Sequence, residues 1–166
     1  EIKNGPSHCE VMMTPDGPCL VEMNCRAHGG DGNWKPLCLA LTGSYSQVEA
    51  TVDAYLDRKE FAQLPDVPPS PFKAYGQEVI LVSFFRGVVK ATPGFETIKD
   101  LSSFVYLETG VKPGSMVDYT IDLFTGIGSV ILMSHDEKEL EADINCIREM
   151  EQKNQLFVYD KQPGLL

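Results

Sequence analysis

The first part of the chain alternates apolar and polar side chains on both sides of a turn signal. Within His8–Arg26, two runs rich in Val, Met, Leu and Cys flank Pro15-Asp16-Gly17. Proline presets the first dihedral angle of a turn, Asp favours turns, and Gly accepts a positive φ. The pattern predicts a β-hairpin with a three-residue loop and a bulge at Gly17.

Strand alternation sorts the side chains of this hairpin onto two faces. One face is apolar and is expected to line a core; it carries Cys9, Val11, Met13, Cys19, Val21 and Met23. The other face is mixed and carries Glu10, Met12, Thr14, Leu20, Glu22, Asn24 and Arg26, with His8 preceding Glu10. When the turn is centred on Asp16, Glu10 lies directly opposite Glu22.

The mixed face is a candidate metal site. Two carboxylates that oppose each other across a strand pair repel, and a cation between them reverses the sign of that interaction. Glu10, Glu22 and the Asn24 amide supply hard oxygen donors, which suit Mg²⁺ or Mn²⁺ with water and phosphate oxygens completing the shell. Arg26, further along the same face, can reach an anion held by such a metal. Periodicity alone leaves a second interpretation open, a solvated outer face that carries two Glu and an Arg.

A glycine-rich loop, Cys25–Asn33, follows the hairpin. Glycines let the backbone approach a ligand closely, and backbone N–H groups in such a loop can face an anion. His28 is the histidine with candidate chemistry, because it follows Arg26 by two residues at the mouth of the loop. A plain connector is the alternative interpretation of this loop.

Helical patterns follow the loop. One helix is expected from Trp34-Lys35-Pro36 to Thr42, with Gly43 as its stop signal. A second is expected to begin at Ser44 or Ser46 and to continue through Phe61. Its buried face is expected to consist of the apolar and small residues at helical spacing, which are Val48, Thr51, Val52, Tyr55 and Leu56.

A proline-rich segment, Asp66–Phe72, predicts a boundary, because prolines at this density exclude both helix and strand interiors. We divide the chain into a first lobe at 1–66, a linker at 67–76 and an α+β subdomain at 77–166. In the last part we predict strands at 77–85, 88–91, 103–108, 116–124 and 129–134, with helices at 95–101 and after a Ser134-x-x-Glu137 capping box. This order describes mainly antiparallel sheets with packed helices, an α+β fold.

Composition narrows the classes of function. The chain has 166 residues, 43% hydrophobic and 23% charged, which is typical of a globular domain. Its formal charge of −10 argues against a nucleic-acid-binding surface, and no apolar run is long enough to span a membrane. The five cysteines form no C-x-x-C pair, which argues against a zinc site or a disulfide framework and favours a reduced, cytoplasmic location. The N-terminal sequence EIKNGPSHCE has no initiator Met and no signal-peptide pattern, so we expect a piece of a longer protein.

These residues resemble a known signature. Glu10, followed after eleven residues by Glu22-Met23-Asn24-Cys25-Arg26, resembles the E…E-x-N-x-R signature of the ATP-grasp superfamily. The surrounding GPSHCEVMMTPDGPCLVEMNCRAHGG is similar to carboxylate–amine ligases of that superfamily, such as L-amino-acid (dipeptide) ligases and carnosine-synthase-like enzymes. The rest of the chain resembles the C-terminal portion of such ligases in general pattern only.

The resemblance implies a reaction in which ATP phosphorylates a carboxylate and an amine then displaces phosphate from the acyl phosphate. It implies that Glu10 and Glu22 hold two Mg²⁺ or Mn²⁺ ions, with Glu22 bridging them and Asn24 as a further ligand. The partners it implies are ATP and small carboxylate and amine substrates, with neither nucleic acid nor membrane.

The resemblance also implies roles after the hairpin. Arg26 is expected to bind the acyl phosphate and the tetrahedral oxyanion as the catalytic residue, with a backbone N–H near Gly29 completing the site. His28 and Gly30 are expected to border the substrate pocket. The N-terminal ATP-grasp lobe, which supplies the phosphate-binding lysines and the adenine pocket, is absent from these residues. We therefore predict that this chain alone neither binds ATP tightly nor turns over.

Two alternatives differ from the ligase hypothesis. A non-catalytic binding module could keep the hairpin only as a scaffold. An ATP-grasp carboxylase or kinase would share the metal site and differ in its acceptor.

Overall fold

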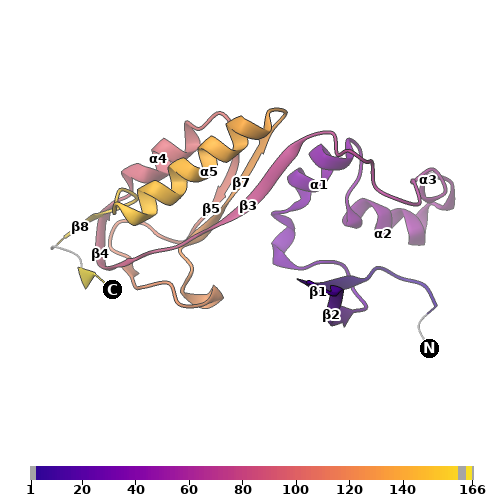
Figure 1. Cartoon of the computed structure of the whole chain (residues 1–166), viewed down its shortest axis with the longest axis horizontal. Coiled ribbons are helices and arrows are strands. Elements are labelled where there is room, and N and C mark those ends of the chain that lie inside the picture. The colour runs from indigo at the N-terminus through magenta and orange to yellow at the C-terminus, as the bar shows by residue number, and fades with distance from the viewer. Residues whose placement is uncertain (1–2, 161–163, 166) are drawn as a thin grey trace. The chain divides into compact units, whose positions relative to one another are not determined.

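The computed structural model describes residues 3–160 and 164–165, and they form two compact units (Figure 1). The first unit ends at Phe72 and the second begins at Lys73. The division falls at the end of the proline-rich segment, and the first strand of the second unit begins at Tyr75, two residues before the predicted position.

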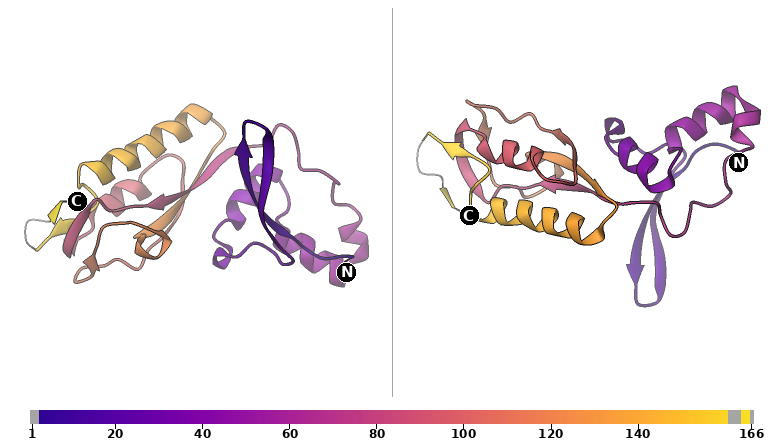
Figure 2. Two further views of the ribbon diagram at one scale, coloured as in Figure 1. Left: turned by 60° about the horizontal axis from the view of Figure 1, so that its bottom comes forward. Right: turned by 90° about the horizontal axis from the view of Figure 1, so that it is seen from above.

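The first unit contains a hairpin and three helices. Strands β1 (His8–Thr14) and β2 (Gly17–Asn24) form the hairpin, which projects away from the helices in the right-hand view of Figure 2. After a 3₁₀ turn, η1 (Gly30–Gly32), come α1 (Lys35–Thr42), α2 (Gln47–Leu56) and α3 (Arg58–Phe61).

Local signals explain the helix ends of the first unit. Gly43 ends α1 with a φ of 84°, as expected for a left-handed C-cap. Ser46 begins α2 with a capping box, in which Glu49 hydrogen-bonds back to the Ser46 backbone N–H. The prediction of one helix through Phe61 is wrong. Asp57 ends α2 in an extended conformation, and its carboxylate then accepts hydrogen bonds from the first backbone N–H groups of α3.

The prediction that the apolar faces of the first unit are buried is also wrong. Within the described residues up to Phe72, only Trp34 and Ser46 are buried. Tyr55 and Leu56 on α2 are 72% and 82% exposed, and Met13 on the hairpin is 74% exposed. No described residue of this unit packs over these faces closely enough to bury them.

The second unit has two antiparallel sheets and two helices, which confirms the α+β class. One sheet has the order β3 (Tyr75–Leu81), β7 (Gly128–Ser134), β5 (Phe104–Glu108). The other centres on β4 (Phe85–Ala91), which pairs with β6 (Met116–Val117), β8 (Val158–Tyr159) and β9 (Gly164–Leu165). The helices are α4 (Pro93–Lys99) and α5 (Glu137–Gln152).

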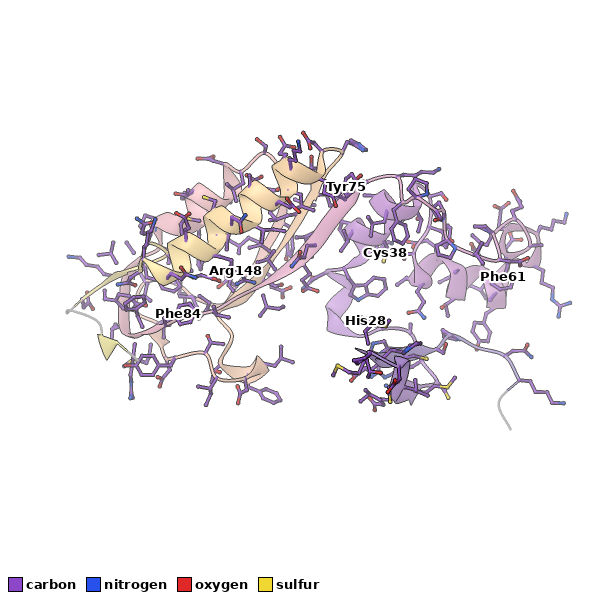
Figure 3. The ribbon with its side chains drawn as sticks, viewed as in Figure 1. His28, Cys38, Phe61, Tyr75, Phe84 and Arg148 are labelled. Carbon is purple, nitrogen blue, oxygen red and sulfur yellow. The ribbon has the colours of Figure 1, made fainter. Side chains whose placement is uncertain are left out.

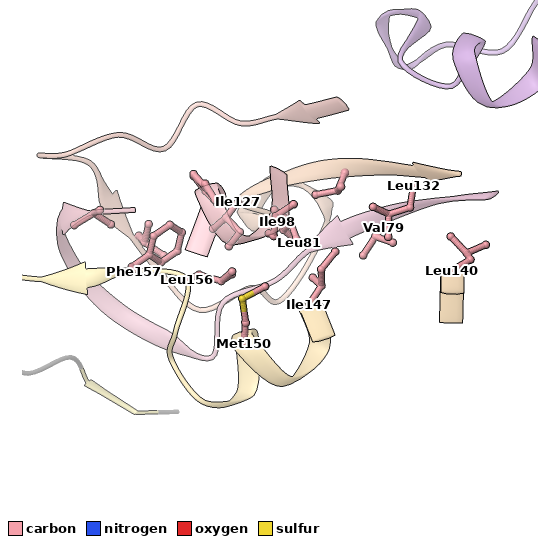
Figure 4. Close-up of a cluster of buried hydrophobic side chains, with 14 residues drawn as sticks. Val79, Leu81, Ile98, Ile127, Leu132, Leu140, Ile147, Met150, Leu156 and Phe157 are labelled. Atoms are coloured by element: carbon pink, nitrogen blue, oxygen red, sulfur yellow. The ribbon is translucent and has the colours of Figure 1, made fainter. Parts of the chain in front are cut away.

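One hydrophobic cluster holds this unit together (Figure 4). The inward residues of β3 and β7 are fully buried, as their apolar runs predict; they include Val79, Leu81, Val130 and Leu132. Helix α5 packs its apolar stripe against them through Leu140, Ile147 and Met150. Burying this apolar area is the main contribution to the stability of the unit.

Three local predictions in the second unit are wrong. The strand predicted at 77–85 ends at Leu81, and Phe85 begins the next strand, which was predicted to begin only at 88. The segment predicted as a strand at 116–124 is a strand only at Met116–Val117, because Asp122 and Thr125 form a reciprocal cap around the 3₁₀ turn η2 (Leu123–Thr125). The N-cap of α5 is Asp136, whose carboxylate accepts from the Lys138 N–H at 2.9 Å. Ser134 instead ends β7, and its hydroxyl accepts from the Asp136 N–H.

Candidate functional site

The hairpin register places the two predicted metal ligands opposite each other. Glu10 pairs with Glu22. Two residues away along each strand, on the same face, His8 pairs with Asn24. Side chains of directly opposed residues in an antiparallel pair lie on the same face. The predicted opposition of Glu10 and Glu22 is therefore present in the structure.

The turn differs from the prediction. Thr14 pairs with Gly17, so the loop has two residues, Pro15 and Asp16, and Gly17 adopts a φ of 111°. The irregularity in the ladder lies between Glu10 and Val11, where Val21 on β2 is the extra residue, and not at Gly17. As a consequence Cys19 lies opposite Met12 on the carboxylate face, while Leu20 lies opposite Val11 on the other face. The predicted face assignments of these two β2 residues are reversed.

The carboxylates on this face have no cationic partner. Glu10 and Glu22 are exposed, and neither forms an ion pair with a described residue. The described residues also contain no group of three or more His, Cys, Asp or Glu side chains that could hold a metal. Two carboxylates and the Asn24 amide oxygen fit a hard cation only if other oxygen ligands complete its shell, which is the donor set expected for a metal–phosphate complex.

Arg26 lies at the start of the loop with an exposed guanidinium group. Its Nη1 donates a hydrogen bond to the Ala27 carbonyl at 3.0 Å, and no described carboxylate pairs with it. A Cβ atom built on Gly29 would lie 4.0 Å from Nη1. The guanidinium group and the Gly29 backbone are therefore neighbours, as the predicted anion site requires.

His28, labelled in Figure 3, is held by contacts on several sides. Its ring meets the His8 ring edge to face at a centroid distance of 4.5 Å and the Trp34 ring at 5.4 Å. Its backbone N–H donates to Gln47 Oε1 at 2.8 Å, and Gln47 Nε2 donates to the Ser7 carbonyl at 2.8 Å. Gln47 thereby links the start of α2 to both the loop and the start of β1.

The Gly29 carbonyl oxygen in the loop contacts both the Trp34 and the His28 side chains. The Gly29 oxygen accepts a hydrogen bond from the indole Nε1 of Trp34, and His28 Nδ1 lies 2.8 Å from the same oxygen. Gly30 has a φ of 76°, and a Cβ there would lie 3.6 Å from Trp34 Cδ1 and 3.8 Å from His28 Cε1. A side chain at Gly30 would strain the backbone because of this positive φ, and it would contact the Trp34 and His28 rings.

Three residues of this cluster were not predicted as site residues. His8, Gln47 and Trp34 lie 20, 19 and 6 positions from His28 in the sequence. The alternation of the first strand places His8 on the same face as Glu10, and this pattern would have been sufficient to include His8 among the candidate site residues. Nothing in the local pattern around Gln47 or Trp34 indicates their contacts, because both arise from tertiary packing.

A groove of about 840 Å³ also lies in the first unit, between residues 3–6 and helices α2 and α3. Tyr55, Arg58 and Phe61 line it. None of the predicted metal- or substrate-binding residues lines this groove, although Gln47 forms part of its wall.

Comparison with known proteins identifies the relatives of this chain. No protein-family model matches it. Dapdiamide A synthase from Enterobacter agglomerans is 29% identical over 154 residues, which is 90% of this chain and 35% of that protein. The crystal structure of an L-amino acid ligase from Bacillus licheniformis matches 95% of this chain with a TM-score of 0.69 and 20% identity. The chain is related to part of the ATP-grasp carboxylate–amine ligases.

This relationship to ATP-grasp ligases confirms the resemblance drawn from the hairpin signature and the mixed α+β fold. The chain spans about a third of the relatives' length, 35% of the synthase and 36% of the structurally matched ligase. None of the described helices is long and apolar enough to cross a membrane. The roles of individual residues stay predictions.

Proposed function

We propose that this chain supplies the metal- and acyl-phosphate-binding part of an ATP-dependent ligase that joins a carboxylate to an amine. The observation that carries the proposal is the direct opposition of Glu10 and Glu22 on a face that continues to Asn24. The relatives, a dapdiamide synthase and an L-amino acid ligase, support this class of reaction.

In this proposal Glu10, Glu22 and Asn24 would hold two Mg²⁺ or Mn²⁺ ions. Such ions would supply positive charge next to the phosphate oxygens of ATP. The two carboxylates repel each other without a cation, so the pair favours the metal-bound form of the hairpin. Their exposure keeps both side chains available to a ligand.

The residues after the hairpin bind the acyl phosphate. The guanidinium group of Arg26 forms no ion pair with a carboxylate among the described residues, so its charge is available for a phosphate group. The neighbouring Gly29 backbone adds a hydrogen-bond donor for the oxyanion of the tetrahedral intermediate. His28 and Gly30 border the pocket for the incoming substrate.

The deciding experiment replaces Glu22 by Ala in the full-length protein that contains this chain. We expect weaker Mn²⁺ binding in the presence of ATP and a loss of about 10²-fold or more in carboxylate- and amine-dependent ADP release, as when one electrostatic catalytic group is removed. Asp66→Asn is the matched control, because Asp66 is an exposed carboxylate of the same unit and lies outside the hairpin strands. If catalysis survives Glu22→Ala, the ligase assignment fails.

The same assay separates the other classes. ADP release that requires the carboxylate but not the amine indicates a kinase-type enzyme. Release that requires bicarbonate in place of the carboxylic acid indicates a carboxylase. A protein that binds the small molecules without consuming ATP, and that is unaffected by Glu22→Ala, is a binding module.

A further inference from the structure

We infer that His28 accepts, at Nε2, the proton that the attacking amine loses, and that the Gly29 carbonyl and Trp34 hold its imidazole ring in the tautomer that this requires. The inference rests on the proposed ligase function and assigns the proton acceptor of its second half-reaction. It is carried by the hydrogen bonds around Gly29.

The Gly29 carbonyl determines which ring nitrogen carries the proton. His28 Nδ1 lies 2.8 Å from the Gly29 oxygen, and a carbonyl oxygen can only accept a hydrogen bond. Nδ1 is therefore the protonated nitrogen in this arrangement. In a neutral imidazole the other nitrogen, Nε2, then carries the lone pair and is the site that can take up a proton.

Trp34 and Gln47 hold this geometry in place. The indole N–H of Trp34 donates to the same Gly29 oxygen, which fixes the orientation of that carbonyl towards the two rings. Gln47 binds the His28 backbone N–H at 2.8 Å. The His8 and Trp34 rings each meet the imidazole ring edge to face, which restricts its rotation.

His28 Nε2 is the ring atom left without a partner. His28 is exposed, and its Nε2 has no hydrogen bond to any residue in the part of the chain that the structure describes. Among the described residues, the titratable side chain that packs against the ring is His8 from β1, and Arg26 lies beside the neighbouring Gly29, while Trp34 and Gln47 are neutral.

The position of Arg26 links the ring to the reacting group. Its Nη1 lies beside Gly29, the residue whose carbonyl binds His28 Nδ1. An acyl phosphate held by Arg26 would therefore lie beside Gly29, the residue that also binds the imidazole ring. Gly30 has a φ of 76°, so a side chain there would strain the backbone next to both groups.

The proton transfer balances as follows. The ammonium form of the amine gives one proton to His28 Nε2, and its lone pair forms the C–N bond to the acyl carbon. The bond between the acyl carbon and the phosphate oxygen breaks, and its electron pair leaves with the phosphate. The phosphate takes the second nitrogen proton and leaves as hydrogen phosphate, and His28 returns its proton to water.

The test compares two nucleophiles in the full-length protein. An α-amine is charged at neutral pH and needs a proton acceptor, whereas hydroxylamine is largely neutral and traps an acyl phosphate as a hydroxamate without one. We expect His28→Gln to lower amine coupling by about 10²- to 10⁴-fold, the usual contribution of a general base, while hydroxamate still forms. The rate of the unmodified protein should fall at low pH as its base becomes protonated, and His28→Gln should lose that dependence.

His135→Gln is the matched control, because His135 belongs to the second unit, outside this cluster, and should leave both reactions unchanged. Amine coupling by His28→Gln at the unmodified rate and pH profile would overturn the inference, and so would equal losses with both nucleophiles. Trp34→Phe keeps an aromatic ring at this position but removes the indole N–H. We expect ¹⁵N NMR of the His28 imidazole in this variant to show a smaller share of the Nδ1–H tautomer. If the unmodified protein forms no hydroxamate at all, the proposed ligase function fails instead.

Discussion

Glu10 and Glu22 oppose each other across the hairpin even though a bulge lies between this pair and the turn. If the register of the turn continued unchanged, Glu10 would oppose Val21, and Glu22 would point to the other face. The extra residue on β2, Val21, shifts the register by one residue, so that Glu10 again lies opposite Glu22. Bulges commonly re-aim side chains next to active sites, and this one aligns the two candidate metal ligands.

The opposition of these carboxylates has a measurable consequence. We expect Glu10→Gln to weaken Mn²⁺ binding by about tenfold or more, because affinity for hard cations depends on ligand charge. Without divalent metal, the same change should raise the melting temperature slightly or leave it unaltered, since it removes a repulsion of about 0.2–1 kcal/mol. Mn²⁺ titration by electron paramagnetic resonance and thermal unfolding measure the two effects. A loss of stability in the metal-free protein would contradict the repulsive pair.

Nucleotide binding by the 166-residue chain alone is a second test. The ATP-grasp resemblance implies that the nucleotide is clamped between two lobes, and the chain spans about a third of its relatives' length, 35% of the synthase. We expect isothermal titration of the isolated chain with Mg-ATP to give no binding in the micromolar range and no ADP to form. Micromolar affinity would show that the adenine and phosphate sites lie within these residues.

The start of helix α2 should make the stability of the protein depend on pH. Hydrogen bonds from Lys35 and then from Ser46 lower the pKa of Glu49 from its usual value of 4.5 to about 2. Because the folded pKa is depressed, the contribution is complete above the unfolded value and is lost as the pH falls from about 4.5 towards 2. Melting temperatures across this window should fall less steeply for Glu49→Gln than for the unmodified protein. Glu60→Gln, an exposed carboxylate on α3, is the control.

The sequence predicts the second unit better than the first for a physical reason. The β3 and β7 runs and the apolar stripe of α5 bury each other within this chain, so periodicity identifies residues such as Val79, Leu132 and Ile147 correctly. The hairpin and α2 have equally clear apolar faces, yet residues such as Met13 and Leu56 are exposed. Periodicity shows which face can be buried, but it does not show whether the residues that would cover it are present.

The sequence likewise predicts some features of the candidate site and misses others. The predicted opposition of Glu10 and Glu22, with Asn24 on the same face, is present, but the predicted turn is not: the observed turn alone would place Glu10 opposite Val21, and the bulge restores the pair. The bulge at Val21 has no local signal, since either neighbouring residue could be the extra one. The contacts of His28 with Gln47 and Trp34 depend on how the helices pack against the loop, which spacing does not encode.

Gly128 is a position where the backbone excludes any side chain. It has a φ of 140°, and a Cβ there would lie 2.2 Å from the Glu108 carbonyl oxygen on the paired strand β5. We expect Gly128→Ala to destabilise the protein by about 2–4 kcal/mol, since it combines backbone strain with a clash that disturbs the sheet. Gly110→Ala is the control, because its Cβ would meet no atom within 4 Å. Urea unfolding of both variants measures the difference, and equal stabilities would contradict the expected clash.

An ion pair between the buried Glu151 and the partly exposed Arg148 attaches helix α5 to the end of strand β3. Glu151 is 2% exposed, accepts the Val82 N–H at 2.9 Å and pairs with Arg148 Nη1 at 2.8 Å. Arg148, labelled in Figure 3, also donates to the Ile80 carbonyl at 3.0 Å. The pair thus satisfies two backbone groups at the edge of the sheet as well as the carboxylate.

Replacing Arg148 alone should therefore lower the free energy of unfolding more than replacing Arg148 and Glu151 together. Arg148→Met leaves the Glu151 carboxylate buried without its cation, and we expect a loss of about 3–5 kcal/mol in the free energy of unfolding. Adding Glu151→Met should recover part of that loss, because the double variant contains no uncompensated buried charge. Lys153→Met breaks the exposed pair with Glu149 on the same helix and should cost about 1 kcal/mol or less. Urea unfolding of the unmodified protein, the single variants Arg148→Met and Glu151→Met, the double variant and Lys153→Met decides the matter; if the losses from Arg148→Met and Glu151→Met simply add, the two side chains are not coupled.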